Sequence, residues 1–207
     1  MLGIIQAAGW PIWPLLACSI IAVALIIERF YSLQTKHVVP EHLMDEVLAL
    51  PNRSLPRPEA IEQLTTHSSL GEVIAAGLKA LQHNPQCGEE EFSAQVQAAG
   101  RRVTAKLERY LSALGSIASV APLLGLFGTV VGMIEIFGSQ APGAGNPAQL
   151  AHGISVALYN TAFGLVIAIP SLVAWRYLRG LVDNYVVELE IDGERLVRHF
   201  FPKSAGR

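Results

Sequence analysis

The chain has 207 residues, of which 51% are hydrophobic and 15% are charged, and its formal net charge at pH 7 is −2. Soluble domains carry about 25% charged residues, and a chain of this size could not surround a core made of several long uncharged helices. The composition therefore argues against a soluble protein, and the near-neutral charge offers no basic surface for nucleic acid.

An apolar N-terminal segment is the first predicted membrane span. Residues 1–9 form a short leader without Lys or Arg, and residues 10–27 are uncharged. This length approaches the roughly 20 residues that cross a ~30 Å hydrocarbon core. A cleaved signal peptide would need a basic start and a small-residue cleavage site. Neither is present, so we expect a retained helix with Pro11 and Pro14 close to its start, where helical amides lack partners.

A polar segment of mixed charge follows over residues 28–110. Three prolines in Leu50–Ala60 predict a linker, and His83–Phe92 predicts a second break. We expect helices over Ala60–Leu81 and Glu89–Tyr110, and the second of these continues without proline into the next apolar stretch. Its charges are expected to form a solvated face.

Two further spans are expected over residues 111–137 and 152–175, with a short loop over residues 138–151 between them. No helix breaker follows the third span, so the tail over residues 176–207 is expected to continue it as a helix. The sequence therefore predicts an all-α integral membrane protein with three transmembrane helices, of which the second and third extend beyond the membrane.

The basic residues predict the orientation of these spans. Nine of the fifteen Lys and Arg residues lie between Arg29 and Arg109, and the other six lie from Arg176 onward. Loops rich in Lys and Arg remain in the cytoplasm. We therefore expect the leader and the 138–151 loop on the outer side, and the large polar segment and the C-terminal tail in the cytoplasm.

Small or polar residues recur three or four positions apart in the second and third spans, so each set shares one helical face. Larger side chains such as Leu114 and Phe127 are expected on the opposite side. Small residues let membrane helices pack closely, which predicts packing roles for Gly125, Gly132, Gly153, Ala157, Gly164 and Pro170. The two stripes are Ser112, Gly115, Ser119, Pro122, Gly125, Thr129 and Gly132, and Gly153, Ala157, Thr161, Gly164, Ala168 and Ser171.

Three polar side chains predict a pore lining or proton path: Thr129 and Thr161 within the stripes, and Asn160 beside Thr161. A threonine can bond its own backbone, so helix packing alone remains an alternative interpretation. An asparagine is costlier to leave unpaired in hydrocarbon, which favours a polar seam. None of the three binds and releases protons near pH 7. Proton transfer would therefore require a carboxylate from a partner protein.

Two ionisable residues near the outer loop set the expected depth of the threonines. Thr129 lies six residues before Glu135, or ~9 Å along a helix. Thr161 lies nine residues after His152, or ~13 Å. If both ionisable residues mark the outer boundary of the membrane, the two hydroxyls lie at similar depth, toward the middle.

The segments SALGSIASVAPLLGLFGTVVGMIEIF and HGISVALYNTAFGLVIAIPSLVAWRY together resemble the MotA/TolQ/ExbB proton channel family, and most closely its ExbB members. The matching motifs surround Thr129 in the first segment, and Thr161 and Pro170 in the second. The resemblance is specific over Ser112–Arg179, and the expected topology matches over the whole chain.

The resemblance implies a homo-oligomer, a pentameric ring in the inner membrane of a Gram-negative bacterium. It implies two copies of an ExbD-like single-span protein in the pore, which supply the protonatable aspartate, and a TonB-like protein that energises import of iron-siderophores or vitamins. The family's pore-facing threonines correspond to Thr129 and Thr161. Many members carry a glutamate at the position of Val156, so a carboxylate of this subunit is not expected at that level.

Alternatives remain open at this stage. The chain could be a TolQ-like subunit for envelope integrity or another stator, or a passive membrane scaffold whose small residues only pack helices against lipids and one another. No nucleophile–base pair, metal-ligand spacing or cofactor motif points to an enzyme. Cys18 and Cys87 lie in different environments, so no disulfide between them is expected.

Overall fold

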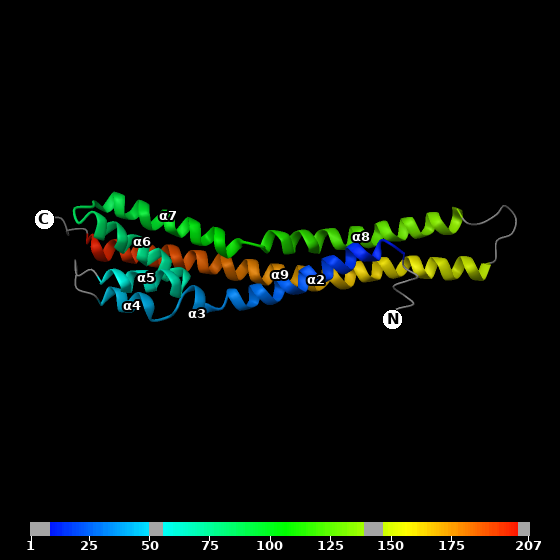
Figure 1. The fold of residues 1–207 in the computed structure, drawn as a ribbon, viewed down its shortest axis with the longest axis horizontal. Helices are drawn as coiled ribbons and strands as arrows, with labels where there is room; N and C mark the ends of the chain where they lie inside the picture. The colour runs from blue at the N-terminus through cyan, green and yellow to red at the C-terminus, as the bar shows by residue number, and fades with distance from the viewer. Residues whose placement is uncertain (1–8, 50–55, 139–146, 203–207) are drawn as a thin grey trace. The chain divides into compact units, whose positions relative to one another are not determined.

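The computed structural model describes residues 9–49, 56–138 and 147–202, and the regular structure in these ranges is helical (Figure 1). The predicted leader, the first half of the linker and most of the outer loop lie outside the described residues. The helices are α2 (Ile12–Ser32), α3 (Thr35–Val38), α4 (Leu43–Leu48), α5 (Pro58–His67), α6 (Ser69–His83), α7 (Glu89–Glu108), α8 (Leu111–Gly138) and α9 (Pro147–Phe200).

Three helical stretches of the described chain are long and apolar enough to cross a membrane: Ile12–Ser32, Glu89–Gly138 and Leu150–Phe200. They overlap the three predicted spans, which confirms an all-α fold with three candidate membrane helices in the described chain. Helix α9 continues for 54 residues without a break, as the absence of a helix breaker predicted. Its internal Pro170 does not end it, which is common in membrane helices because neighbouring groups satisfy the freed backbone carbonyl.

The predicted continuous helix from Glu89 through the second span is wrong at one point. Helix α7 ends at Glu108 and α8 begins at Leu111. Between them, Tyr110 has φ +68°, a left-handed conformation that residues other than glycine rarely adopt. The Arg29 guanidinium lies 5.4 Å from the centroid of the Tyr110 ring, a cation–π contact. A contact between residues so far apart in the sequence leaves no local signal, and neither Pro nor Gly marks the break.

The predicted helix over Ala60–Leu81 is also interrupted. Ser68 is extended, and its Oγ accepts a hydrogen bond of 3.0 Å from the Gly71 amide, which caps the start of α6. The chain turns so tightly here that a Cβ on Gly71 would collide with the Leu64 carbonyl oxygen. A serine cap can be recognised in a sequence. The prediction of one helix across Ser68 was wrong because the residues on both sides of it keep an amphipathic pattern.

The contacts divide the chain into two units, which we describe separately. The first unit comprises Met1–Arg29 and Tyr110–Tyr177. In it, α2, α8 and α9 meet at a small cluster of the buried residues Leu15, Ala121 and Ala168. Two of these three are alanines, so the helices approach closely at this point.

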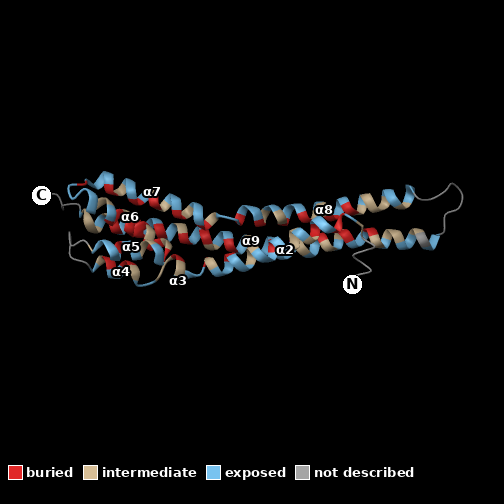
Figure 2. Cartoon of the chain, viewed as in Figure 1, coloured by how far each residue is buried: buried red, intermediate tan, exposed pale blue. Residues whose placement is uncertain are grey.

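The second unit comprises Phe30–Arg109 and Leu178–Arg207. Its core contains large side chains: Phe92 is fully buried and its ring centroid lies 5.7 Å from that of Phe200 and 5.4 Å from that of Phe201. The short helices α3 and α4, which the sequence did not predict, bury Val38, Met44 and Val47. Figure 2 shows the buried positions concentrated along α6.

Candidate proton-path site

Glycines set the distance between α8 and α9 in the first unit. A Cβ on Gly125 would lie 2.7 Å from the Asn160 carbonyl oxygen, and one on Gly164 would lie 2.6 Å from the Ala121 carbonyl oxygen. Both distances are shorter than van der Waals contact, so the close approach requires glycine. The two helices therefore pack backbone to backbone, as membrane helices with small-residue faces do.

The other predicted packing residues divide into two groups. A Cβ on Gly132 would lie 3.2 Å from the Ala157 Cβ, and one on Gly153 would lie 2.6 Å from the Ile136 Cδ1. These residues lie at the α8–α9 contact, and their packing roles stay predictions. Pro170 is exposed in the single chain, so its packing role stays a prediction.

The contact face of α8 differs in part from the predicted stripe. Leu114 was expected on the opposite face, but it is fully buried, whereas the stripe residues Ser112 and Ser119 are exposed. Gly115 of the stripe does face α9, since a Cβ there would lie 2.9 Å from the Trp175 Nε1. The small residues therefore locate part of the contact face and miss the buried Leu114.

Thr129 and Thr161 come together between α8 and α9. Their Oγ1 atoms lie 2.6 Å apart, and the Thr129 Oγ1 also donates to the Gly125 carbonyl oxygen at 3.1 Å. Both residues are half-buried. The two hydroxyls therefore lie at the same level of the α8–α9 pair, although 32 residues separate them in the chain, and their depth in the membrane stays a prediction.

Asn160 lies next to this pair and faces α8. Only 1% of its surface is exposed, and a Cβ on Gly128 would lie 3.0 Å from the Asn160 Nδ2. The sequence analysis did not assign a role to Gly128, although its spacing from Gly125 and Gly132 places it on the same face. The missed glycine makes room for the asparagine side chain inside the contact.

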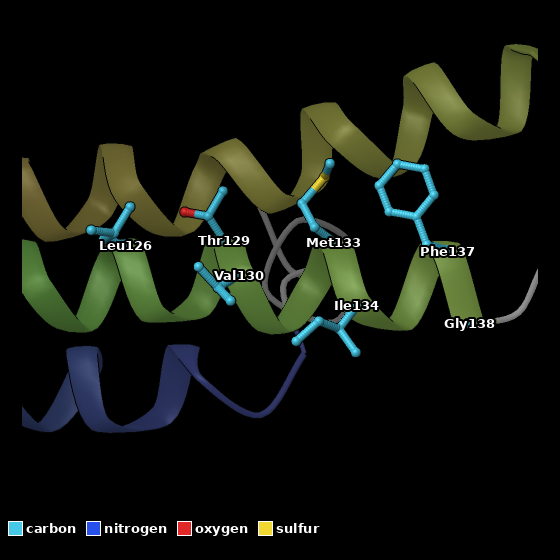
Figure 3. Close-up of a pocket in the computed structure, with 7 residues that line it drawn as sticks. All are labelled: Leu126, Thr129, Val130, Met133, Ile134, Phe137 and Gly138. Carbon is cyan, nitrogen blue, oxygen red and sulfur yellow. The ribbon is translucent and has the colours of Figure 1, made fainter.

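An open groove of about 670 Å³ adjoins the threonine pair (Figure 3). Its lining is apolar except for Thr129, and in Figure 3 the Ile134 side chain points away from α9. The lining residues are Leu126, Thr129, Val130, Met133, Ile134, Phe137 and Gly138. Among the described residues that line this groove, Thr129 is thus the one with a hydroxyl group.

The charged residues nearest to the pair along the sequence are remote from it. No acidic or basic side chain lies between Leu111 and Ile134, and from Ile136 to Trp175 only His152 can carry a charge. Glu135 and His152 are both exposed. The arrangement can form hydrogen bonds to water or to a polar partner group within apolar walls, but its own hydroxyls do not exchange charge near pH 7.

The second unit contains two buried polar side chains that the sequence analysis missed. The Tyr185 hydroxyl donates to the Leu33 carbonyl oxygen at 3.0 Å and lies 3.0 Å from the Thr35 Oγ1. Asp192 is buried beside Arg195, at 3.3 Å. Burial raises the pKa of Asp192, Arg195 opposes that shift, and Asp45 adds to it. In the sequence, Tyr185 and Asp192 belong to a segment that predicts a solvated helix, and no local pattern marks either side chain as buried.

The fold and the site together define a helical membrane protein. Its last two spans pack through glycines, and a pair of threonine hydroxyls lies between them. Residues 65–191 match the sequence model of the MotA/TolQ/ExbB proton channel family. The chain therefore belongs to this family and is one of its transport subunits.

Named relatives are similar over most of the chain. Biopolymer transport protein exbB1 of Vibrio cholerae is 33% identical over 191 residues, covering 89% of this chain and 82% of the relative. Putative biopolymer transport protein ExbB-like 3 of Synechocystis is 36% identical, covering 85% and 83%. Tol-Pal system protein TolQ of Pseudomonas aeruginosa is 33% identical over 116 residues, covering 52% and 50%.

Proposed function

We propose that this chain is the ring-forming subunit of an inner-membrane proton channel and motor of the Ton type in a Gram-negative bacterium. With an ExbD-like single-span partner, it uses the proton motive force to energise TonB-dependent import of iron-siderophores or vitamins across the outer membrane. The observation that carries this proposal is the Thr129–Thr161 pair, which places hydroxyls 2.6 Å apart among apolar residues.

The partner is part of the proposal because the pair needs a protonatable group. A proton relay in the membrane uses side chains that bind and release protons, and a threonine does neither near pH 7. The family resemblance implies a glutamate at the position of Val156 in many members, and valine supplies no carboxylate at that level. A partner aspartate beside Thr129 and Thr161 would complete the path, with Asn160 holding the α8–α9 contact behind them.

Assembly into a ring is supported by what the single chain leaves uncovered. The groove beside Thr129 is open, and the exposed Ser112 and Ser119 lie on α8. A polar seam at the edge of a helix pair is best satisfied by further helices, and repeated identical contacts close into cyclic symmetry. The count of five comes from the family resemblance alone.

Reconstitution tests the proposal directly. The chain purified from membranes is expected to bring with it a small single-span protein that has an intramembrane aspartate. Liposomes containing both proteins should conduct protons under an applied potential, and liposomes containing this chain alone should not. Equal proton flux with and without the partner, or no flux with it, would contradict the motor and favour a passive scaffold.

The proposed orientation has the N-terminus and the 138–151 loop in the periplasm and the C-terminus in the cytoplasm. Single cysteines at Lys36, Arg57 and Gly145 of a variant without Cys18 and Cys87 test it. A membrane-impermeant maleimide should label Gly145→Cys in intact cells, and should label Lys36→Cys and Arg57→Cys only after lysis. Labelling of Arg57→Cys in intact cells would refute this topology.

A TolQ-like role is the second candidate, and the similarity to the Pseudomonas TolQ protein over about half of this chain favours it. The two roles predict different losses when the gene is deleted. A Ton-type subunit is needed for growth on siderophore-bound iron, whereas a TolQ-like subunit is needed for resistance to detergents and large antibiotics. Complementation by the intact chain identifies which loss belongs to it.

A further inference from the structure

The hydrogens of the two threonine hydroxyls can be assigned by counting. A hydroxyl has one hydrogen to donate, and its oxygen can also accept. The Thr129 Oγ1 donates to the Gly125 carbonyl oxygen at 3.1 Å, because a carbonyl can only accept. Thr129 then has no hydrogen for the 2.6 Å contact with the Thr161 Oγ1, so Thr161 is the donor in that contact.

The hydrogen bonds of the pair therefore run in one direction: Thr161 donates to Thr129, and Thr129 donates to the Gly125 carbonyl oxygen. Both hydroxyl hydrogens are used inside the chain, whereas lone pairs remain on both oxygens. Both residues are half-buried, and Thr129 lines the groove of Figure 3. A group that reaches the exposed part of either threonine, from the groove in the case of Thr129, therefore meets a hydrogen-bond acceptor and no hydroxyl donor.

The helices packed around the pair do not change this polarity. Asn160 is only 1% exposed, so its amide is not presented to an incoming group. On α8 the nearest charged residue along the chain is Glu135, and on α9 it is His152, both exposed. On α2 no acidic or basic residue lies between Ile12 and Ile27.

We propose that this hydroxyl pair selects the protonated form of a partner's carboxylic acid. An ionised carboxylate only accepts hydrogen bonds, whereas a protonated acid has one O–H to donate. The acid can therefore donate to Thr161 or Thr129, and the ion finds no hydroxyl donor. The inference rests on the proposed function for the presence of such a partner, and adds which of its protonation states this subunit binds.

The ion can be accommodated only if the hydroxyls turn. Thr129 would have to donate to Thr161 and release its bond to Gly125, so that the Thr161 hydrogen points at the carboxylate. Losing one hydrogen bond of this kind corresponds to about a five-fold preference for the acid, or roughly 0.7 pKa unit. The site thus binds the partner more tightly while it carries the proton than after the proton leaves.

The test is a titration of the partner's carboxylic acid in the intact complex. Infrared difference spectra follow the C=O band of the protonated acid as pH changes, in the complex of this chain with its co-purified single-span partner. Thr129→Val removes the acceptor of the Thr161 hydrogen, which then becomes available to the carboxylate. We expect the partner's pKa to fall by about 0.7 unit in this variant.

Two other variants make the result specific. Thr161→Val leaves the Thr129 hydrogen on Gly125 and supplies no donor, so no comparable fall in pKa is expected. Ser155→Ala is the control, because the Ser155 hydroxyl bonds the Ala151 carbonyl of its own helix and is not part of the pair. Its titration should match that of the unmodified chain.

The outcomes separate this inference from the function on which it rests. Equal shifts in Thr129→Val and Thr161→Val, or no shift in either, would overturn the selection if the complex still conducts protons. A complex with no titrating intramembrane carboxyl group, or with no proton conduction before any substitution, would overturn the proposed function as well.

Discussion

The two units of this chain differ in the side chains that they expose and in those that fill their helix contacts. In the first unit, large apolar residues are exposed, such as Leu123 at 63% and Val166 at 66%, and the buried contact residues include Ala121 and Gly125. In the second unit, large residues such as Phe92 are buried, and ion pairs such as Lys106–Glu72, at 2.7 Å, lie at the surface.

The difference follows from the surroundings that suit each unit, which are lipid for the first and water for the second. In water, burial of large apolar side chains drives folding. In lipid, the surrounding tails are as apolar as leucine, so helices associate through close backbone packing and a few polar contacts. Helix α9 takes part in both units and follows both rules along its 54 residues.

Leucine truncation should give the largest contrast between the units. Leu78 in α6 is fully buried, whereas Leu123 in α8 is 63% exposed. Leu78→Ala should destabilise the protein by about 2–5 kcal/mol because it leaves a cavity. Leu123→Ala removes a side chain that faces outward and should cost less than about 1 kcal/mol. Thermal unfolding in detergent measures both, and equal losses would contradict the assignment of the two environments.

A glycine pair on α9 tests the packing in the first unit. A methyl group on Gly164 would lie 2.6 Å from the Ala121 carbonyl oxygen, whereas one on Gly180 meets nothing within 4 Å. Gly164→Ala should therefore destabilise the protein by about 1–3 kcal/mol. Gly180→Ala should be neutral or slightly stabilising, because alanine favours helix. Melting temperatures and membrane levels of the two variants provide the comparison.

A hydrogen-bond deletion tests a polar contact of the second unit. Tyr185→Phe removes the hydroxyl that donates to the Leu33 carbonyl oxygen. The loss should be about 1–2 kcal/mol, since a buried carbonyl is left without this donor. In a Thr35→Val background the same substitution should cost less, because the two hydroxyls lie in one network. Additive losses in the double variant would show that Thr35 and Tyr185 act independently.

The smallest predicted effect concerns pH. Burial raises the pKa of Asp192 above its ordinary value, so the folded state holds this proton more tightly than the unfolded state. The resulting stabilisation is present at low pH and is lost as pH rises through the folded-state pKa. Asp192→Asn should therefore be slightly more stable than the unmodified chain near neutral pH, and the two should converge in acid. A difference that grows on acidification would reverse the sign.

The sequence was informative where a local pattern of residue types corresponds to one kind of structure. Uncharged length predicted three spans, and residue spacing placed Thr129 and Thr161 at the same level. It was less informative where distant side chains decide local structure. The break at Tyr110 accompanies a contact with Arg29, and Trp175 of α9 packs over Gly115 of α8. Such contacts join residues that no local pattern connects.

The central claim is that the hydroxyls of Thr129 and Thr161 serve transport, and not only helix packing. Valine has nearly the shape of threonine, so the Thr129→Val, Thr161→Val double variant removes the hydroxyls and keeps the packing. The decisive measurement is siderophore-dependent growth at low iron in a strain that depends on this chain, with membrane levels of the protein checked by immunoblot. The account predicts normal protein levels and a severe loss of growth, and normal growth of the double variant would contradict it.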